Sequence, residues 1–388
     1  MDKDEKKRSL PRRMLAFFLT LALVLGSVFL VANWQKLNFD FIRRYFSYRD
    51  LKRNEHGQVE SFTYDGGLNS SFLQVGGDLL VCSAGGVRLY SESGAAYVDQ
   101  VCSLTNPVLS SGGSAGLVYD AGGSELFVYQ NHELVFSLSI GEGRTLLSAS
   151  LSAQGQLTTV TQQSGVKGAV TVYDSSFQPS WGVNLSSRFV TDAILSPDGS
   201  TLAVLTAGQT GGVYDSQVSL YSQSHAAGDS TPDAVCSLGN NAVLKVAWPS
   251  GPLRVLGETA LCYVNADGSL AGSYPYSYRY LKGFSLDGDN FSTLLLGKYR
   301  AGTEAELLTV GLDGQSVASL PLDQQILSLS SAGRYLSILT ADGLSIYTNE
   351  LKPYHSSTDL LGERKLLQRP DGTVTLLSDE TARLYLPQ

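Results

Sequence analysis

The sequence predicts an all-β fold, an eight-bladed β-propeller, and two observations carry this prediction. Turn glycines recur about every 42 residues from residue 77 onward, and an apolar strand that usually ends in tyrosine follows each of them. A period near 42 residues is typical of propeller blades built from four strands. A third observation, an apolar segment near the N-terminus, predicts a transmembrane helix ahead of the propeller.

The glycine repeat places a tight turn ahead of an apolar strand in each unit. In "SPDGSTLAV", Gly199 follows a Pro-Asp pair and opens onto an alternating apolar run. Glycine suits such turns because it accepts a positive φ without steric cost. Successive glycines are 36 to 52 residues apart, at Gly77, Gly113, Gly155, Gly199, Gly251, Gly288, Gly333 and Gly372.

The tyrosine that ends the following strand keeps the same period, and we expect it to pack between blades. Six of the eight units have it, at Tyr90, Tyr129, Tyr173, Tyr221, Tyr347 and Tyr385. Two units carry insertions ahead of this position, "GQTGGVYDSQ" and "GKYRAGTEAE". Both insertions fall at the turn between the second and third strands, so they are expected to project from one rim and to build a binding face.

The last unit supplies only three strands before the sequence ends at Gln388. The segment "QVESFTYD", residues 58–65, is expected to add the fourth strand and to close the ring without an exposed edge. Seven blades is the alternative, because the Gly251 unit is the weakest repeat. We place the propeller at residues 57–388.

The N-terminal segment from Met14 to Asn33 contains no ionisable side chain. A helix over these residues rises about 30 Å, which matches a hydrocarbon core. We therefore predict a transmembrane helix at residues 14–33, between a basic cytoplasmic tail at 1–13 and an amphipathic juxtamembrane helix at 34–56. A cleaved signal peptide is the alternative, although Leu30, at −3 from a cleavage after Ala32, fits such a site poorly.

The distribution of charge follows the same boundary. Residues 1–56 carry 12 basic and 6 acidic side chains, a net of +6, and the remaining 16 basic and 30 acidic side chains give residues 57–388 a net of −14. An acidic propeller argues against nucleic acid as a partner. The basic tail and the large domain that follows favour a cytoplasmic N-terminus and an extracytoplasmic propeller at the cell membrane.

The lipid bilayer is the expected partner of residues 14–33. Residues 34–53 combine aromatic and basic side chains, and two interpretations stay open for them: an interfacial helix that contacts lipid headgroups, or a stalk that packs against the domain.

At "SPDGSTLAV" the chain resembles the blades of bacterial extracytoplasmic propellers, the TolB-like and YVTN-lactonase-like kinds. With its apolar segment and tyrosine-ended strands, it is similar to an uncharacterised family of bacterial single-pass membrane proteins that carry a β-propeller of unknown function. The resemblance implies a fold and a location, and it implies no activity. The Trp-Asp dipeptide of WD repeats is absent, and two propeller tryptophans are too few for the docking motif of quinone-dependent dehydrogenases.

No motif predicts a catalytic residue, a metal site or a cofactor. The string "GGSAG" around Ser114 precedes a strand, whereas a nucleophile elbow needs a helix there. Asp287, Asp289 and Asn290 offer hard oxygen ligands for Ca²⁺, but a hairpin turn explains their spacing equally well. The four cysteines form no C-x-x-C pair, and we expect them to be buried free thiols. Because their number is even, an extracytoplasmic disulfide is the alternative.

The candidate recognition patch is the segment "YPYSYRYLKG", which we expect to be an exposed connection between strands. Tyrosine and arginine are enriched at protein interfaces. The binding residues proposed on this basis are Tyr274, Tyr276, Tyr278, Arg279 and Tyr280.

Two functions remain open on the sequence. The leading hypothesis is a membrane-anchored propeller that acts as a binding or scaffolding module at the cell envelope. The alternative is a lactonase- or glycan-cleaving hydrolase with its site at the central channel. Three or more acidic or histidine side chains that converge in the channel would favour the enzyme, and a mixed polar lining would favour binding.

Overall fold

A computed structural model describes residues 9–32, 39–49, 51, 54, 57–225, 228–277 and 279–387. The chain divides into two compact units, Met1–Asp50 and Leu51–Gln388. The first unit contains α1 (Ser9–Ala32) and α2 (Phe39–Ser47), and the described strands all belong to the second.

α1 exposes large apolar side chains from Met14 to Val28, with exposed fractions between 40 and 71%. Among the residues that the structure describes, there is no helix of sufficient length and apolar character to cross a membrane. α2 covers part of the juxtamembrane helix predicted at 34–56. The rest of that prediction falls largely on residues 34–38, 50, 52–53 and 55–56, which lie outside the described residues.

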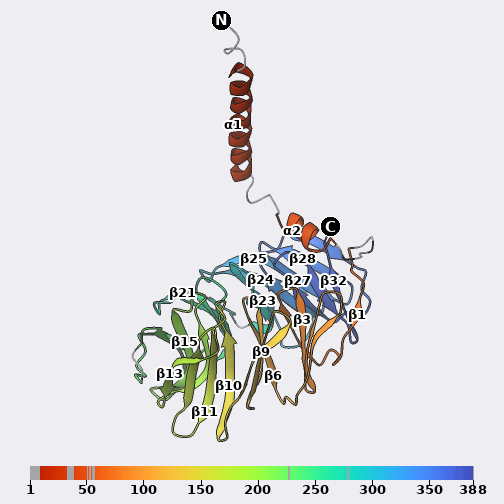
Figure 1. Ribbon diagram of the computed structural model, residues 1–388. Helices are drawn as coiled ribbons and strands as arrows, with labels where there is room; N and C mark the ends of the chain where they lie inside the picture. Colours follow the sequence, from red (N-terminus) through yellow and green to blue (C-terminus); the bar gives the residue numbers. More distant parts are fainter. Residues whose placement is uncertain are drawn as a thin grey trace. The chain divides into compact units, whose positions relative to one another are not determined.

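The second unit is an eight-bladed β-propeller made of eight separate four-stranded antiparallel sheets (Figure 1). Each of the first seven blades uses four consecutive strands, beginning at β2. Blade 1 contains β2 (Ser71–Val75), β3 (Asp78–Ser83), β4 (Gly86–Tyr90) and β5 (Ala96–Val101). Blade 2 contains β6 (Pro107–Gly112), β7 (Ala115–Asp120), β8 (Glu125–Gln130) and β9 (Glu133–Ser139). Blade 3 contains β10 (Arg144–Leu151), β11 (Leu157–Gln163), β12 (Gly168–Tyr173) and β13 (Pro179–Leu185).

The next four blades continue the same pattern. Blade 4 contains β14 (Phe189–Leu195), β15 (Thr201–Thr210), β16 (Val213–Ser222) and β17 (Ala234–Gly239). Blade 5 contains β18 (Val243–Ala247), β19 (Leu253–Gly257), β20 (Ala260–Val264) and β21 (Leu270–Pro275). Blade 6 contains β22 (Tyr280–Ser285), β23 (Phe291–Gly297), β24 (Glu304–Gly311) and β25 (Ser316–Asp323). Blade 7 contains β26 (Ile326–Ala332), β27 (Tyr335–Thr340), β28 (Leu344–Thr348) and β29 (Pro353–Ser357).

Blade 8 closes the ring with strands from both ends of the propeller sequence. It contains β30 (Lys365–Gln368), β31 (Val374–Leu377) and β32 (Thr381–Tyr385), and β1 (Phe62–Thr63) pairs with β32 at its outer edge. The backbone amide of Val59 also donates to Leu384 O over 2.9 Å. The prediction of eight blades, with the last one completed by residues 58–65, is therefore confirmed.

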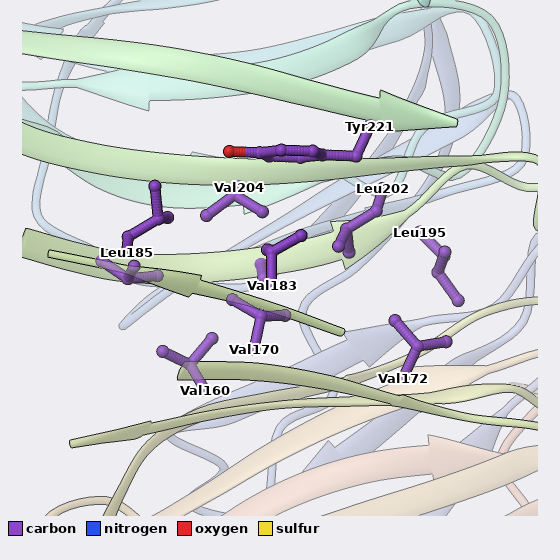
Figure 2. Packing of buried hydrophobic residues seen from close by; sticks show 11 residues of the cluster. Val160, Val170, Val172, Val183, Leu185, Leu195, Leu202, Val204 and Tyr221 are labelled. Carbon is purple, nitrogen blue, oxygen red and sulfur yellow. The ribbon is translucent and has the colours of Figure 1, made fainter. Parts of the chain in front are cut away.

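Buried side chains fill the space between neighbouring blades. Figure 2 shows one such layer, in which valines of blade 3, among them Val160 and Val170, pack against Leu202, Val204 and Tyr221 of blade 4. A single four-stranded sheet cannot bury its own apolar faces, so each blade is stabilised by its neighbours.

The repeat tyrosines contribute to these layers, as predicted. Tyr90, Tyr129, Tyr221 and Tyr385 are at most 6% exposed. The hydroxyl of Tyr129 in blade 2 donates to Gln100 Oε1 of blade 1 over 2.7 Å, so it links two blades directly.

The turn glycines mostly adopt the conformation that the repeat predicts. Gly199 has a φ of 72°, and Gly113, Gly155, Gly251, Gly333 and Gly372 are also positive. In the first unit Gly76, rather than Gly77, takes the positive φ.

The cysteines are free, and three of the four are buried. Burial raises the pKa of Cys82 to about 12, so this thiol is protonated and unreactive at neutral pH. The prediction of buried free thiols holds, except that Cys102 is only half-buried.

Both predicted insertions form long hairpins at the same end of the disc. In blade 4, β15 and β16 stay paired up to Thr210 and Val213, three residues beyond Ala207, which pairs with Phe189 at the start of β14. In blade 6, residues 298–303 join β23 to β24, and Tyr280 at the start of β22 pairs with Gly297. Blade 5 lies between them in sequence, and only Glu258 and Thr259 join β19 to β20. The two long hairpins therefore flank a blade with a short one.

Candidate functional site

The first strand of each blade is the innermost one, because first strands of neighbouring blades contact each other around most of the ring. Serine side chains tie several of these strands together. Ser150 Oγ of β10 donates to Ala193 O of β14 over 2.8 Å, and Ser331 Oγ of β26 bonds Ser285 Oγ of β22 over 2.8 Å. The inner wall of the propeller is therefore partly a set of polar contacts between blades.

A β-bulge occurs at the equivalent place in the innermost strands of blades 3 to 7. A bulge re-aims the side chains that follow it. The first paired residue after the bulge is, in order, Ser148, Asp192, Lys245, Gly283 and Ser328. This alignment places a carboxylate and an ammonium group at matching positions of blades 4 and 5.

Asp192 is the centre of a small charged cluster on the innermost strands. It accepts a hydrogen bond from Ser148 Oγ of blade 3 and one from the amide of Ala193 over 2.8 Å. Burial raises the pKa of Asp192, and both Ser148 and Lys245 oppose that rise. Burial also raises the pKa of Asp287, which follows β22, with Lys245 and Arg254 opposing. The Asp287 side chain is nevertheless exposed to solvent.

The inner wall fits the mixed polar lining expected for binding better than the three or more converging acidic or histidine side chains expected for catalysis. Asp192 and Asp287 are the two carboxylates there, with Lys245 near both of them, and no innermost strand contains a histidine. The remaining polar groups are mostly serines and glutamines, such as Gln74 and Gln368. Neither Asp192 nor Lys245 was singled out from the sequence, although each is the one charged residue of its first strand, and an alignment of the eight repeats would have revealed them.

The segment with Asp287, Asp289 and Asn290 is a turn held by an arginine. Arg254 is fully buried, and its guanidinium donates to the carbonyl oxygens of Leu286, Gly288, Asp289 and Phe291 over 2.5 to 2.9 Å. This cation occupies the carbonyl oxygens that a metal ion would need. Over the described ranges, no group of three or more His, Cys, Asp or Glu side chains has a metal-binding arrangement.

The predicted recognition patch is only partly exposed. Tyr276 is 2% exposed and its hydroxyl donates to Gly257 O over 2.9 Å, so its assignment to an exposed patch is wrong. The side chain instead belongs to the core between blades 5 and 6. Tyr280 is 48% exposed, Tyr274 packs partly against the core, and Tyr278 lies outside the described residues.

Arg279 joins this segment to blade 6. Its guanidinium forms an ion pair with Glu306 of β24, donates to the hydroxyl of Tyr274 over 2.8 Å and to Tyr276 O over 3.0 Å. Arg279 and Glu306 also line a surface pocket of about 500 Å³. Arg279 is the one described residue of the predicted patch that lines this pocket, whose other lining residues come from the β23–β24 hairpin and from β25.

Exposed apolar side chains gather at the end of the disc that carries the long hairpins, over blades 4 to 6. Phe189 and Tyr280 begin innermost strands, and Leu244 is the second residue of another. We call this surface the hairpin face, and define it by six residues that are 42 to 64% exposed: Phe189, Val213, Tyr214, Leu244, Tyr280 and Tyr299. Large exposed apolar side chains gathered on one surface mark interaction sites more often than chance positions do.

These features define an eight-bladed β-propeller whose polar inner wall lacks a catalytic constellation among the described residues and which carries six exposed apolar residues at one end of blades 4 to 6. The chain belongs to a family of unknown function, DUF5711, whose model matches residues 48–250. A comparison with curated protein sequences finds no match.

Several solved structures share the fold. The C-terminal WD40 domain of Sif2 superposes with a TM-score of 0.57 at 12% identity, covering 85% of this chain and 99% of its own. BamB from Moraxella catarrhalis gives 0.52 at 12% identity, with 84% and 96% covered. The quinohemoprotein alcohol dehydrogenase ADHIIG from Pseudomonas putida HK5 gives 0.53 at 10% identity, with 84% and 75% covered. At these identities the likeness concerns the fold alone.

Proposed function

We propose that this chain is a membrane-anchored binding module, in which the propeller engages a protein partner through the hairpin face at the cell envelope. The observation that carries the binding part is the hairpin face itself, with Val213 at 64% and Tyr299 at 57% exposure on two separate hairpins. Exposed aromatic residues on a rigid scaffold supply contact area at low cost in conformational entropy.

The inner wall supports binding over hydrolysis. A hydrolase of the lactonase or glycan-cleaving type would need an acid, a base or a metal converging on one solvated point. Asp192 and Asp287 are the two candidates, and Lys245 lies near both of them. Asp192 already accepts bonds from Ser148 and Ala193, which suits a structural role between blades.

The membrane part of the proposal rests on the sequence of residues 14–33 and on the exposed apolar side chains of α1. Six lysines and arginines in residues 3–13 favour a cytoplasmic N-terminus, with the propeller outside. Alkaline carbonate extraction of the full chain, and of a chain lacking residues 1–33, tests the anchor. Retention of the full chain in the pellet and release of the truncated one is expected, and release of both would contradict it.

Site-specific photo-crosslinking in the full chain tests the binding face. A photoreactive amino acid at Val213 or Tyr299 is expected to yield an adduct of defined mass, and one at Val101 is not. Val101 is the matched control because it is 84% exposed and lies on the outermost strand of blade 1. Adducts of equal yield at all three positions, or none at Val213 and Tyr299, would contradict binding through the hairpin face.

A further inference from the structure

The pocket beside the β23–β24 hairpin lies on the side of blade 6 that faces blade 5. Leu296 belongs to the core shared with blade 5, and it pairs across the sheet with Glu306, which pairs in turn with Pro321. The next row toward the hairpin contains Glu304, paired directly with Asp323. All of these residues line the pocket of about 500 Å³, so its wall is a double row of side chains from three paired strands.

The charges of this pocket are not balanced. Glu304, Glu306 and Asp323 face Arg279 and Lys298, which leaves one negative charge in excess. Arg279 is fully engaged with Glu306 and Tyr274. Lys298 Nζ reaches Glu304 only at 3.8 Å, and both side chains are more than half exposed. Within the described residues, Asp323 accepts a hydrogen bond from Thr303 Oγ1 over 3.0 Å and no ion pair joins it to a cation.

The direct pairing of Glu304 with Asp323 is the feature that points to a ligand. Like charges directly opposite each other on paired strands destabilise a sheet. A bound cation between the two carboxylates would remove that repulsion, and the position beside the open hairpin leaves room for one.

The surroundings of the carboxylates indicate an organic cation. Leu296 and Pro321 present apolar surface one row below them, and Tyr299 is exposed on the adjoining hairpin. A lysine or arginine side chain has a methylene stem that packs on such surface and a charged end that reaches carboxylates. A metal ion would gain nothing from the apolar row.

We infer that this pocket binds a lysine or arginine side chain of an extended peptide segment in the protein partner. The inference rests on the proposed function. It adds that the partner presents a basic side chain beside the hairpin face. The net charge of −14 over residues 57–388 would steer a basic segment toward the propeller.

A displayed library of random peptides, selected on the full chain in detergent, tests the inference. The recovered peptides are expected to share a lysine or arginine at one position with apolar neighbours. Their recovery is expected to fall about tenfold or more on the double variant Glu304→Gln, Asp323→Asn. These substitutions remove charge from exposed positions and keep the shape, so thermal unfolding should be unchanged or slightly raised.

The matched control is the double variant Glu133→Gln, Glu350→Gln, which removes the same charge from exposed acids at turns on the opposite end of the disc. It should leave recovery unchanged. Peptides without a shared basic position, an absence of recovered peptides, or equal recovery on the two double variants would overturn the inference. If crosslinks at Val213 and Tyr299 form while this selection fails, the hairpin face binds its partner without a basic anchor, and only the inference is lost.

Discussion

Blade 8 and blade 6 each contain an arginine–glutamate pair, and the two pairs lie in opposite environments. Arg383 and Glu363 are 4 and 3% exposed, with Nε and Oε1 2.5 Å apart. Arg279 and Glu306 are 26 and 36% exposed and line an open pocket. The closing blade uses its charges inside the structure, whereas blade 6 presents them to solvent.

The difference follows from what each blade has to do. β1 itself supplies only two paired residues to blade 8. Backbone bonds such as Leu386 N to Gly57 O extend this pairing, and buried side chains add to the closure of the ring. Arg383 of β32 donates to Gln58 Oε1 ahead of β1 and to Asp359 O over 3.0 Å, and Gln58 Nε2 donates to the same carbonyl over 2.7 Å. Blade 6 has four full strands and can leave its hairpin free for contacts.

The largest expected effect comes from breaking the buried pair. Arg383→Met leaves Glu363 as an unpaired buried carboxylate and removes the donors to Gln58 and Asp359, so we expect a loss of about 3 to 5 kcal/mol in unfolding free energy. The matched variant Arg279→Met breaks a partly exposed pair and should cost less than about 1 kcal/mol. Denaturant unfolding of the two variants measures the contrast, and similar losses would contradict the assignment of Arg383 as the closure of the ring.

A smaller effect is expected at the tyrosines. Tyr129→Phe keeps the ring between blades 1 and 2 but leaves Gln100 Oε1 without its donor, which should cost about 1 kcal/mol. Tyr299→Phe removes a hydroxyl from a side chain that is 57% exposed and should change stability by less than about 0.5 kcal/mol. Thermal melts of both variants suffice. If Tyr299→Phe lost more stability than Tyr129→Phe, the hairpin face would contribute to the stability of the fold and would not be a surface available for a partner.

Most of the fold could be predicted from the sequence because it depends on local chemistry that repeats. Turn glycines such as Gly199 and strand-ending tyrosines such as Tyr221 recur at the blade period, and a three-stranded final unit requires a strand from the other end. The long hairpins also followed from spacing alone, because an insertion between two paired strands can only extend them outward.

The candidate site was harder to predict from the sequence, because it depends on which strands face each other after the ring closes. Arg279 was found by composition, but Glu304, Glu306 and Asp323 come from strands that are adjacent only in the folded sheet. Tyr276 could not be told apart from the neighbouring tyrosines in the sequence, and its burial in the core between blades 5 and 6 appears only in the folded structure. That Asp192 and Lys245 occupy matching positions of neighbouring blades could be seen only after the β-bulges of the innermost strands were aligned.

The inner wall supplies a prediction that depends on pH. Because the folded-state pKa of Asp192 is raised, the folded protein holds this proton more tightly than the unfolded chain, and that stability is lost as pH rises through the folded pKa. Asp192→Asn keeps an acceptor for Ser148 without the charge. The variant should melt about 2 °C above the parent at pH 8, and the difference should shrink as pH falls toward 4.

For Asp198, in the exposed turn before β15, we expect the opposite dependence of stability on pH. Hydrogen bonds from Ser196 and Ser200 lower its pKa, so its contribution to stability is present at neutral pH and is lost as pH falls. Asp198→Asn should therefore melt below the parent at pH 7, by an amount that decreases in acid. If Asp192→Asn and Asp198→Asn shifted the melting temperature in the same direction near neutral pH, the raised pKa of Asp192 would be contradicted.

The smallest expected effect is on the hairpins, and it bears on function most directly. Replacing Val213 and Tyr299 together by serine removes two apolar side chains that are 64 and 57% exposed, so the unfolding free energy should change by less than about 0.5 kcal/mol. A protein that gains nothing in stability from two exposed apolar side chains on two separate hairpins has another use for them. If the double variant instead loses more than about 1 kcal/mol, these side chains are part of the packing of blades 4 and 6, and the hairpin face would no longer be a surface set aside for a partner.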